Sequence, residues 1–234
     1  MRKSWTPELT FDLPDGTTVA VTVTRLLNGG YAGREQDEVA AHVAELAELG
    51  VPAPEVTPAL YPVAPYLAAQ TDAVPVQHGR TSGEAEWALV VAGPQPRDLL
   101  LTVACDHTDR ALEVHGVAWS KNAGLDVLGR GAWRLADVED HLDELRLRAW
   151  VTSGGGPERL IQDATLAALL PPRHWLGSVG HLLEPGTVLL SGTVSMLPGV
   201  DQFADRWRVE LADPVTGHAL GLSYTVERMP EPIG

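Results

Sequence analysis

Two glutamates stand two positions apart at the start of an apolar segment, Glu84 and Glu86 in SGEAEWALVV at residues 82–91. An extended chain points residues i and i+2 to the same side of a sheet, so both carboxylates are expected on one face of a strand. At a separation of about 4 Å and an effective dielectric constant of about 20, two such charges repel by about 4 kcal/mol. If the pair is buried, a proton, a cation or a metal ion must lie between the carboxylates; if it is solvated, the repulsion falls to about 1 kcal/mol and no partner is needed.

A third carboxylate follows in LLLTVACDHTDR at residues 99–110. At a period of two, one face of this segment carries Leu101, Val103 and Cys105, and the other carries Thr102, Ala104, Asp106, Thr108 and Arg110. If this strand pairs with the one that bears the two glutamates, three carboxylates converge on one spot. Oxygen-only ligands of this kind select Mg²⁺, Mn²⁺ or Ca²⁺ over zinc or copper. The alternative is a solvated strand end at which Asp106 merely pairs with Arg110.

An H-x-x-E pair, His42 and Glu45, lies in a segment with helical periodicity. Side chains three residues apart on a helix are neighbours, so Glu45 could orient the imidazole of His42 and raise its basicity for activating water. The same spacing recurs at His141 and Glu144, which shows how little the pattern specifies by itself. The alternative is an ordinary polar helix face.

Lys121 follows Trp119 in GVAWSKNAG. A lysine beside buried aromatic residues could present a cation to a substrate oxyanion, or its ammonium group could extend to water. The glycine-rich segment TSGGGPERL at 152–160 lacks the ending of a phosphate-binding loop, and the sequence has neither a G-x-G-x-x-G nor a G-x-S-x-G motif. Nucleotide binding and serine hydrolase chemistry are therefore not supported.

The elements that must position these residues are mostly strands. We predict a β-hairpin at about 8–26, a helix within 35–52, and strands at 84–92 and 99–110 that carry the three carboxylates. Further predictions are a helix at 135–150, a short helix at 160–172, and strands at 185–194, 207–214 and 221–229. These elements indicate one domain over residues 1–234, of the α+β class and rich in β-structure.

The charge balance limits the classes of partner. Asp and Glu number 31 against 17 Lys and Arg, and the formal net charge of −14 would repel nucleic acids and anionic membrane surfaces. No segment has the apolar length of a signal peptide or a membrane span. With Cys105 as the single cysteine, a disulfide framework is excluded, so a reducing, cytoplasmic location is expected.

Five short motifs follow one another between residues 33 and 193, namely AGREQDEVAAHVAEL, the E-x-E of SGEAEWAL, CDHTDR, WSKNAG and VLLSGTV. Their order resembles the fumarylacetoacetate hydrolase superfamily, in particular its single-domain acylpyruvate hydrolase and oxaloacetate decarboxylase branch. The chain is also similar to a bacterial subfamily in which TSGE and DHTDR occur together, and that likeness implies no particular substrate.

The resemblance implies a fold, a cofactor and a set of roles. The fold would be the mixed β-roll of the fumarylacetoacetate hydrolase C-terminal-domain type, in a homodimer with Mg²⁺ or Mn²⁺ bound, or Ca²⁺ in a crystal. The substrate would be a small anionic 2-oxo acid of the 1,3-diketo type, hydrolysed at a carbon–carbon bond. The implied metal ligands are Glu84, Glu86 and Asp106, the catalytic residues His42, Glu45 and Lys121, and the substrate-binding residues Arg34, Thr108, Arg110, Gly192 and Thr193.

Two positions depart from the family pattern, and other reactions remain open. Glu113 stands where the family usually has glutamine, which makes the pocket more acidic, and Val194 stands where a proline often follows the last threonine. Decarboxylation, tautomerisation or dehydration of a 2-oxo acid would proceed through the same enolate. A non-catalytic binder of oxo acids, with the ion as anchor, is the alternative from another functional class.

Overall fold

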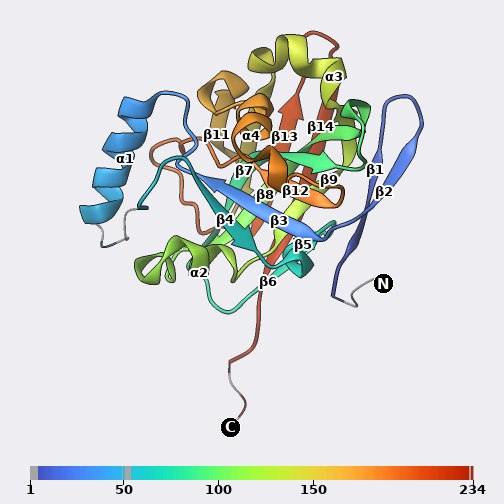
Figure 1. Ribbon diagram of the computed structural model, residues 1–234. Helices are drawn as coiled ribbons and strands as arrows, with labels where there is room; N and C mark the ends of the chain where they lie inside the picture. The colour runs from blue at the N-terminus through green and yellow to red at the C-terminus, as the bar shows by residue number, and fades with distance from the viewer. Residues whose placement is uncertain (1–4, 49, 51–53, 232, 234) are drawn as a thin grey trace.

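Strands make up most of the described part of the chain (Figure 1). The computed structural model describes residues 5–48, 50, 54–231 and 233, without the side chains at positions 36, 38, 42, 45, 46 and 48. The strands are β1 (Glu8–Asp12), β2 (Thr18–Thr22), β3 (Arg25–Gly30), β4 (Ala59–Val63), β5 (Ala68–Ala69), β6 (Ala73–Val76), β7 (Thr81–Val91), β8 (Leu99–Asp109), β9 (Asp126–Arg134), β10 (Arg146–Thr152), β11 (Arg159–Thr165), β12 (Thr187–Leu190), β13 (Arg206–Ala212) and β14 (Ala219–Arg228).

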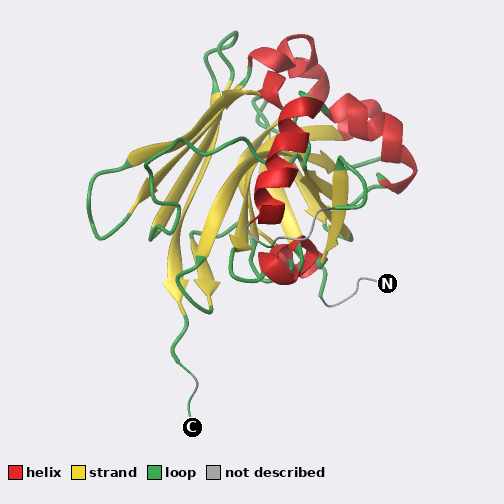
Figure 2. Ribbon diagram, turned by 90° about the vertical axis from the view of Figure 1, so that its left-hand side faces the viewer, coloured by secondary structure: helices red, strands yellow, loops and turns green. Residues whose placement is uncertain are grey.

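The helices are short. They are α1 (Gln36–Glu48), α2 (Val117–Lys121), α3 (Leu135–Val138) and α4 (Pro172–Val179), with 3-10 turns η1 (Pro65–Leu67), η2 (Pro96–Asp98), η3 (Glu113–His115), η4 (Glu139–Glu144), η5 (Leu166–Ala168) and η6 (Gly180–Leu182). None of the described helices has the length and apolar character needed to span a membrane. Helices and 3-10 turns lie at the ends and along the outside of the strand layers (Figure 2).

The described strands form two sheets. The larger has nine strands in the order β2-β1-β9-β8-β7-β12-β3-β4, with β5 beside β9, and the smaller has the order β11-β10-β13-β14-β6. Parallel pairs such as β12 with β3 occur among antiparallel ones such as β7 with β8, so the larger sheet is mixed. The predicted α+β, β-rich class is confirmed.

The larger sheet curls back on itself. Asn28 on β3 and Asp106 on β8 are separated by two intervening strands, which in a flat sheet would put them roughly 14 Å apart. Instead, Nδ2 of Asn28 lies 3.1 Å from Oδ2 of Asp106. Strands β3 and β8 therefore face each other across the inside of a roll.

Each face of β7 and β8 packs on a different core. The inward face, which includes Ala88, Val90 and Leu100, belongs to a cluster that fills the roll. The outward face includes Trp87 and packs against the smaller sheet in a second cluster, with members Val103, Cys105, Trp207 and Tyr224. Glu84, Glu86 and Asp106 are in phase with the inward face, so the strands place them at one end of the roll interior.

Most of the expected elements are present. The hairpin predicted at 8–26 is formed by β1 and β2, and the helix predicted within 35–52 is α1. Strands β7, β8, β12, β13 and β14 match the segments predicted at 84–92, 99–110, 185–194, 207–214 and 221–229.

Two predicted helices are wrong. Within 135–150, helix α3 ends at Val138, a 3-10 segment with a non-helical residue at His141 follows, and β10 begins at Arg146. The residues from 159 onward form β11, which pairs with β10, and the predicted helix at 160–172 reduces to the 3-10 turn η5. Both segments have local helical spacing, but pairing with a neighbouring strand outweighs a local preference of this size.

Candidate metal centre

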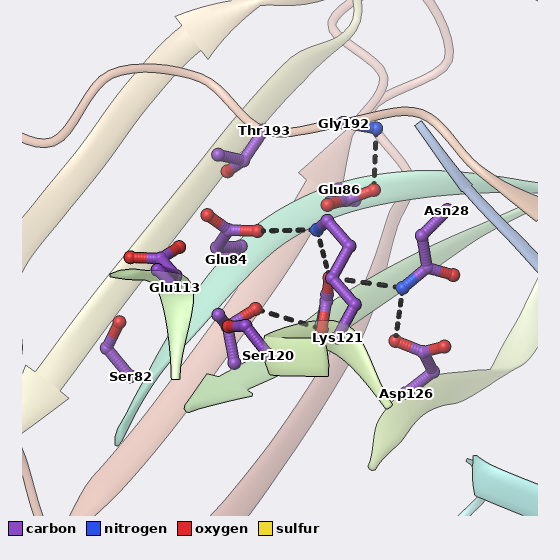
Figure 3. Close-up of polar contacts among 12 residues, drawn as sticks. Asn28, Ser82, Glu84, Glu86, Glu113, Ser120, Lys121, Asp126, Gly192 and Thr193 are labelled. Atoms are coloured by element: carbon purple, nitrogen blue, oxygen red, sulfur yellow. Dashed lines mark hydrogen bonds and ion pairs between the residues drawn. The ribbon is translucent and has the colours of Figure 1, made fainter. Parts of the chain in front are cut away.

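Three carboxylates meet at the end of the roll, as the spacing of the two strands predicts. Figure 3 labels two of them, Glu84 and Glu86, beside Lys121. Strands β7 and β8 pair so that Glu84 lies opposite Asp106 and Glu86 opposite Ala104. One ligand atom from each of Glu84, Glu86 and Asp106 lies within 4.8 Å of the other two, close enough to hold one metal ion. Glu86 and Asp106 are fully buried and the Glu84 side chain is 13% exposed, so the alternative of a solvated strand end is wrong.

Lys121 supplies the positive charge beside these carboxylates. Its Nζ donates to Oε2 of Glu84 at 3.1 Å and to Oδ2 of Asp106. Helix α2 is tied to the end of β8 because Ser120 Oγ donates to the carbonyl of Asp109 at 2.8 Å. The Lys121 side chain is 5% exposed, so it does not extend to water; Trp119, expected to be buried beside it, is 69% exposed. Burial opposes the charge of Lys121, but Asp106 and Glu84 outweigh it and raise the pKa of the ammonium group well above its usual range.

One carboxylate oxygen of Glu86 receives no hydrogen bond from the described residues. Its Oε2 accepts from the backbone N–H of Gly192 at 2.7 Å, while its buried Oε1 has no hydrogen-bond partner in the described part of the chain. Burial raises the pKa of Glu86 well above its usual range, against the opposing charge of Lys121. A buried oxygen without a donor, in a group of three carboxylates, is the environment that a hard divalent cation satisfies. The residues present therefore fit such an ion.

Asn28 and Asp126 form a second layer behind Asp106. The side-chain amide of Asn28 donates to Oδ2 of Asp106 at 3.1 Å and to Oδ1 of Asp126 at 3.0 Å. Burial and the charge of Asp106 raise the pKa of Asp126 well above its usual range. This layer holds one oxygen of Asp106 in place and lies on the closed side of the centre.

Arg110 occupies the opposite, more open side. Its guanidinium donates to Oε1 of Glu84 at 2.9 Å, to Oε1 of Glu113 at 2.7 Å and to Oγ of Ser82 at 2.7 Å. Burial opposes ionisation of Glu84, but the charges of Lys121 and Arg110 outweigh it and lower the pKa of Glu84 to about 2. Arg110 thus pairs with Glu84 and Glu113, and the alternative in which it pairs with Asp106 is wrong.

The remaining predicted site residues are placed as follows. Thr108 Oγ1 donates to Oδ1 of Asp106 at 3.2 Å, and Gly192 reaches Glu86 through its backbone. Thr193 donates to the carbonyl of Ala85 at 2.8 Å. Arg34 instead forms a bidentate pair with Asp143 at 2.7 Å and donates to the carbonyl of Leu169. His42 and Glu45 lie on α1, and their side chains fall outside the described part of the structure, so their roles stay predictions.

Sequence reasoning missed four residues at this site, namely Asn28, Tyr31, Tyr61 and Asp126. Asp126 is the first residue of β9 and lies opposite Asp106, a register that the sequence does not show. Tyr31 has a left-handed backbone with φ 55°, which is uncommon for a residue other than glycine. Burial, the nearby Tyr61 and the charges of Glu113 and Glu84 raise the pKa of Tyr31 to about 12.

Comparison with sequence families gives one match over most of the chain. Residues 29–224 match the family described as "Protein of unknown function (DUF2848)". The chain belongs to this family. The matched range contains the three carboxylates, Lys121, Arg110 and Glu113. A comparison with curated proteins found no match.

Solved structures share the fold at low sequence identity. Cg1458 with an inhibitor is 20% identical with a TM-score of 0.63, and the alignment covers 90% of this chain and 79% of that one. The structure of 2-keto-3-deoxy-D-arabinonate dehydratase complexed with magnesium and 2,5-dioxopentanoate is 17% identical with a TM-score of 0.58, covering 88% and 74%. The apo form of that dehydratase gives 17% and 0.62, covering 89% and 74%. These proteins have the fumarylacetoacetate hydrolase-like fold, and the likeness shows that fold for this chain.

Proposed function

We propose that this protein is a divalent-metal-dependent enzyme that acts on a small 2-oxo acid, within the fumarylacetoacetate hydrolase superfamily. The observation that carries the proposal is the buried group of Glu84, Glu86 and Asp106, whose ligand atoms lie within 4.8 Å of one another and which includes an acceptor without a donor. The magnesium complex of the dehydratase of similar fold supports the same cation class. Mn²⁺ fits the same oxygen ligands.

A bound divalent ion would supply Lewis-acid charge to the carboxylate and keto oxygens of a 2-oxo acid and so favour enolate formation. Glu84, Glu86 and Asp106 would hold the ion, and Asn28 would keep Asp106 oriented through its amide hydrogen bond. The ammonium group of Lys121, held beside Glu84 and Asp106, would stabilise negative charge that develops on the substrate.

Two reactions are candidates for this site. In the first, His42 oriented by Glu45 would take a proton from water as the water attacks the second carbonyl of a 1,3-diketo acid. The carbon–carbon bond would then break, its electron pair would pass to the enolate of the departing 2-oxo acid, and a proton would convert that enolate to the 2-oxo acid. In the second, a 2-oxo-3-deoxy acid loses water, a reaction favoured by the likeness to 2-keto-3-deoxy-D-arabinonate dehydratase. Loss of activity on an acylpyruvate in His42→Ala would support hydrolysis. Turnover of a 2-oxo-3-deoxy sugar acid by the same variant would support dehydration.

Titration calorimetry with Mg²⁺ and Mn²⁺ on chelator-treated protein tests the centre, repeated with oxalate as a mimic of the enolate. We expect one bound ion per chain, tighter binding with oxalate, and an affinity lowered at least about tenfold in Glu86→Gln. Glu158→Gln is the matched control, because Glu158 pairs with Arg208 on β13 and the same charge is removed at an ion pair outside the centre.

Metal binding that is equally strong in Glu86→Gln and wild type would contradict the proposed centre. Tight metal and oxalate binding without turnover of any 2-oxo acid would instead indicate a non-catalytic binder. Light scattering on the same sample tests the further proposal of a homodimer. The proposed single folded domain over residues 1–234 should unfold in one transition, which denaturant unfolding measures.

A further inference from the structure

The open side of the centre sets which part of a substrate it can accept. The exposed fraction of the carboxylate side chains increases toward Glu113. Glu86 is fully buried and Asp106 is 1% exposed, whereas Glu84 is 13% and Glu113 is 18% exposed. In Figure 3, Glu113 lies on the far side of Glu84 from Lys121. A ligand anchored at the three carboxylates can therefore extend its tail past Glu84 toward Glu113.

The cation on this side is already paired. Arg110 donates through Nη2 to Glu84, through Nη1 to Glu113 and through Nε to Ser82, so every nitrogen of the guanidinium has an internal acceptor. Two carboxylates share its single positive charge. Arg110 consequently offers little net attraction to a second carboxylate on a substrate.

Arg34 does not fill that role either. Both of its terminal nitrogens bind the carboxylate of Asp143 at 2.7 Å, and its Nε donates to the carbonyl of Leu169. Within the described part of the chain, Arg110 and Lys121 are the cations that pair with Glu84, Asp106 and Glu113, which together with Glu86 make a set of four carboxylates. A divalent ion would bring this set to neutrality, and the carboxylate of a 2-oxo acid would then make it negative.

Glu113 contributes the carboxylate that makes the site negative once a metal ion and a 2-oxo acid are bound. A glutamine in its place would still accept from Arg110 but would leave one guanidinium charge shared with Glu84 alone. We infer that Glu113 selects against a second carboxylate, so that the site accepts a monoanionic 2-oxo acid with an uncharged tail and rejects a dicarboxylate. This inference rests on the proposed function and specifies its substrate class.

A matched pair of ligands tests the inference by calorimetry on the Mg²⁺-loaded protein. 2-Oxopentanoate and 2-oxoglutarate have five carbons each and differ in a terminal methyl against a carboxylate. We expect wild type to bind 2-oxopentanoate at least about tenfold more tightly, and Glu113→Gln to lower that ratio about tenfold by improving 2-oxoglutarate binding. Glu113→Asp, which keeps the charge, should retain the preference, and Glu158→Gln should leave the ratio unchanged.

The outcomes separate this inference from the function on which it rests. Metal-dependent binding of both ligands, with 2-oxoglutarate bound as well or better by wild type, would overturn the role of Glu113 and leave the metal-dependent site standing. A preference that persists in Glu113→Gln would also overturn it. If neither ligand binds with Mg²⁺ present, both the inference and the proposed function are wrong. If Glu113→Gln fails to fold, the ratio of the two ligand affinities in wild type still tests the inference.

Discussion

At the scale of single residues, Lys121 supplies the positive charge that stabilises the buried carboxylates when no metal ion is bound. Its ammonium group contacts both Glu84 and Asp106 in a site that is almost fully buried. Lys121→Met keeps an unbranched side chain, one atom shorter, and removes the charge, so the metal-free protein should lose about 3–5 kcal/mol of stability. Added Mg²⁺ should restore much of this loss, because the ion neutralises the same carboxylates. Thermal unfolding with chelator and with Mg²⁺ measures both effects.

The control for this variant is Arg146→Met, which removes a cation from an exposed ion pair with Asp163. We expect little change in its melting temperature and an Mg²⁺-induced shift equal to that of wild type. If Lys121→Met were as stable as wild type in chelator, or gained no more from Mg²⁺ than wild type does, Lys121 would not be the internal counter-ion of the carboxylates.

The sequence predicted the meeting of the carboxylates but not their environment. The spacing of Glu84 and Glu86, and the alternation around Asp106, are local properties of two strands, so the chain itself displays them. The amide of Asn28 reaches Asp106 only because the sheet curls, and Asp126 lies opposite Asp106 only through the β8–β9 register. Contacts that depend on long-range closure leave no pattern in the sequence around either residue.

At the scale of elements, one side chain joins β3 to β8 and β9 across the inside of the roll. Asn28→Ala removes the donor to two buried carboxyl groups, so we expect a loss of about 1–3 kcal/mol in the free energy of unfolding. Mg²⁺ affinity should fall about 10- to 100-fold, since Asp106 loses the hydrogen bond that orients it. Denaturant unfolding and calorimetry give the two numbers. Gln77→Ala, an exposed amide between β6 and β7, should change neither, and unaltered metal affinity in Asn28→Ala would refute the orienting role.

The distinction between local spacing and long-range contacts also explains which elements the sequence could predict. The alternation in β7, β8 and β13 is long and regular, and the prediction of strands there is confirmed. In β10 the inward residues are Leu147, Ala149 and Val151, but Val138, Leu142 and Leu145 just before the strand have helical spacing and predict a helix that continues through it. Antiparallel pairing with both β11 and β13 decides the outcome, and those partners lie beyond any local window.

At the scale of the whole molecule, buried acids make the stability of the metal-free protein depend on pH. Burial raises the pKa of Glu86 and of Asp126 well above their usual values, so the folded state holds protons that the unfolded state releases. The stability from these groups is fully present below their unfolded pKa and is lost as pH rises toward the folded pKa. Burial acts in the opposite direction on His107, lowering its pKa to about 4, but that group costs stability only below its unfolded value of 6.5.

Above about pH 7 the buried carboxyls therefore dominate the pH dependence. The free energy of unfolding of chelator-treated protein should fall as pH rises above about 7, by up to about 1.4 kcal/mol per pH unit for each group that is still protonated. Mg²⁺ should flatten this slope, because the ion stabilises the ionised carboxylates, and its stabilising effect should grow with pH. Denaturant unfolding at several pH values with and without Mg²⁺ measures the slopes, and Glu86→Gln should reduce the metal-free slope. A slope that is the same with and without Mg²⁺ would mean that the buried acids of this centre do not exchange protons for the ion.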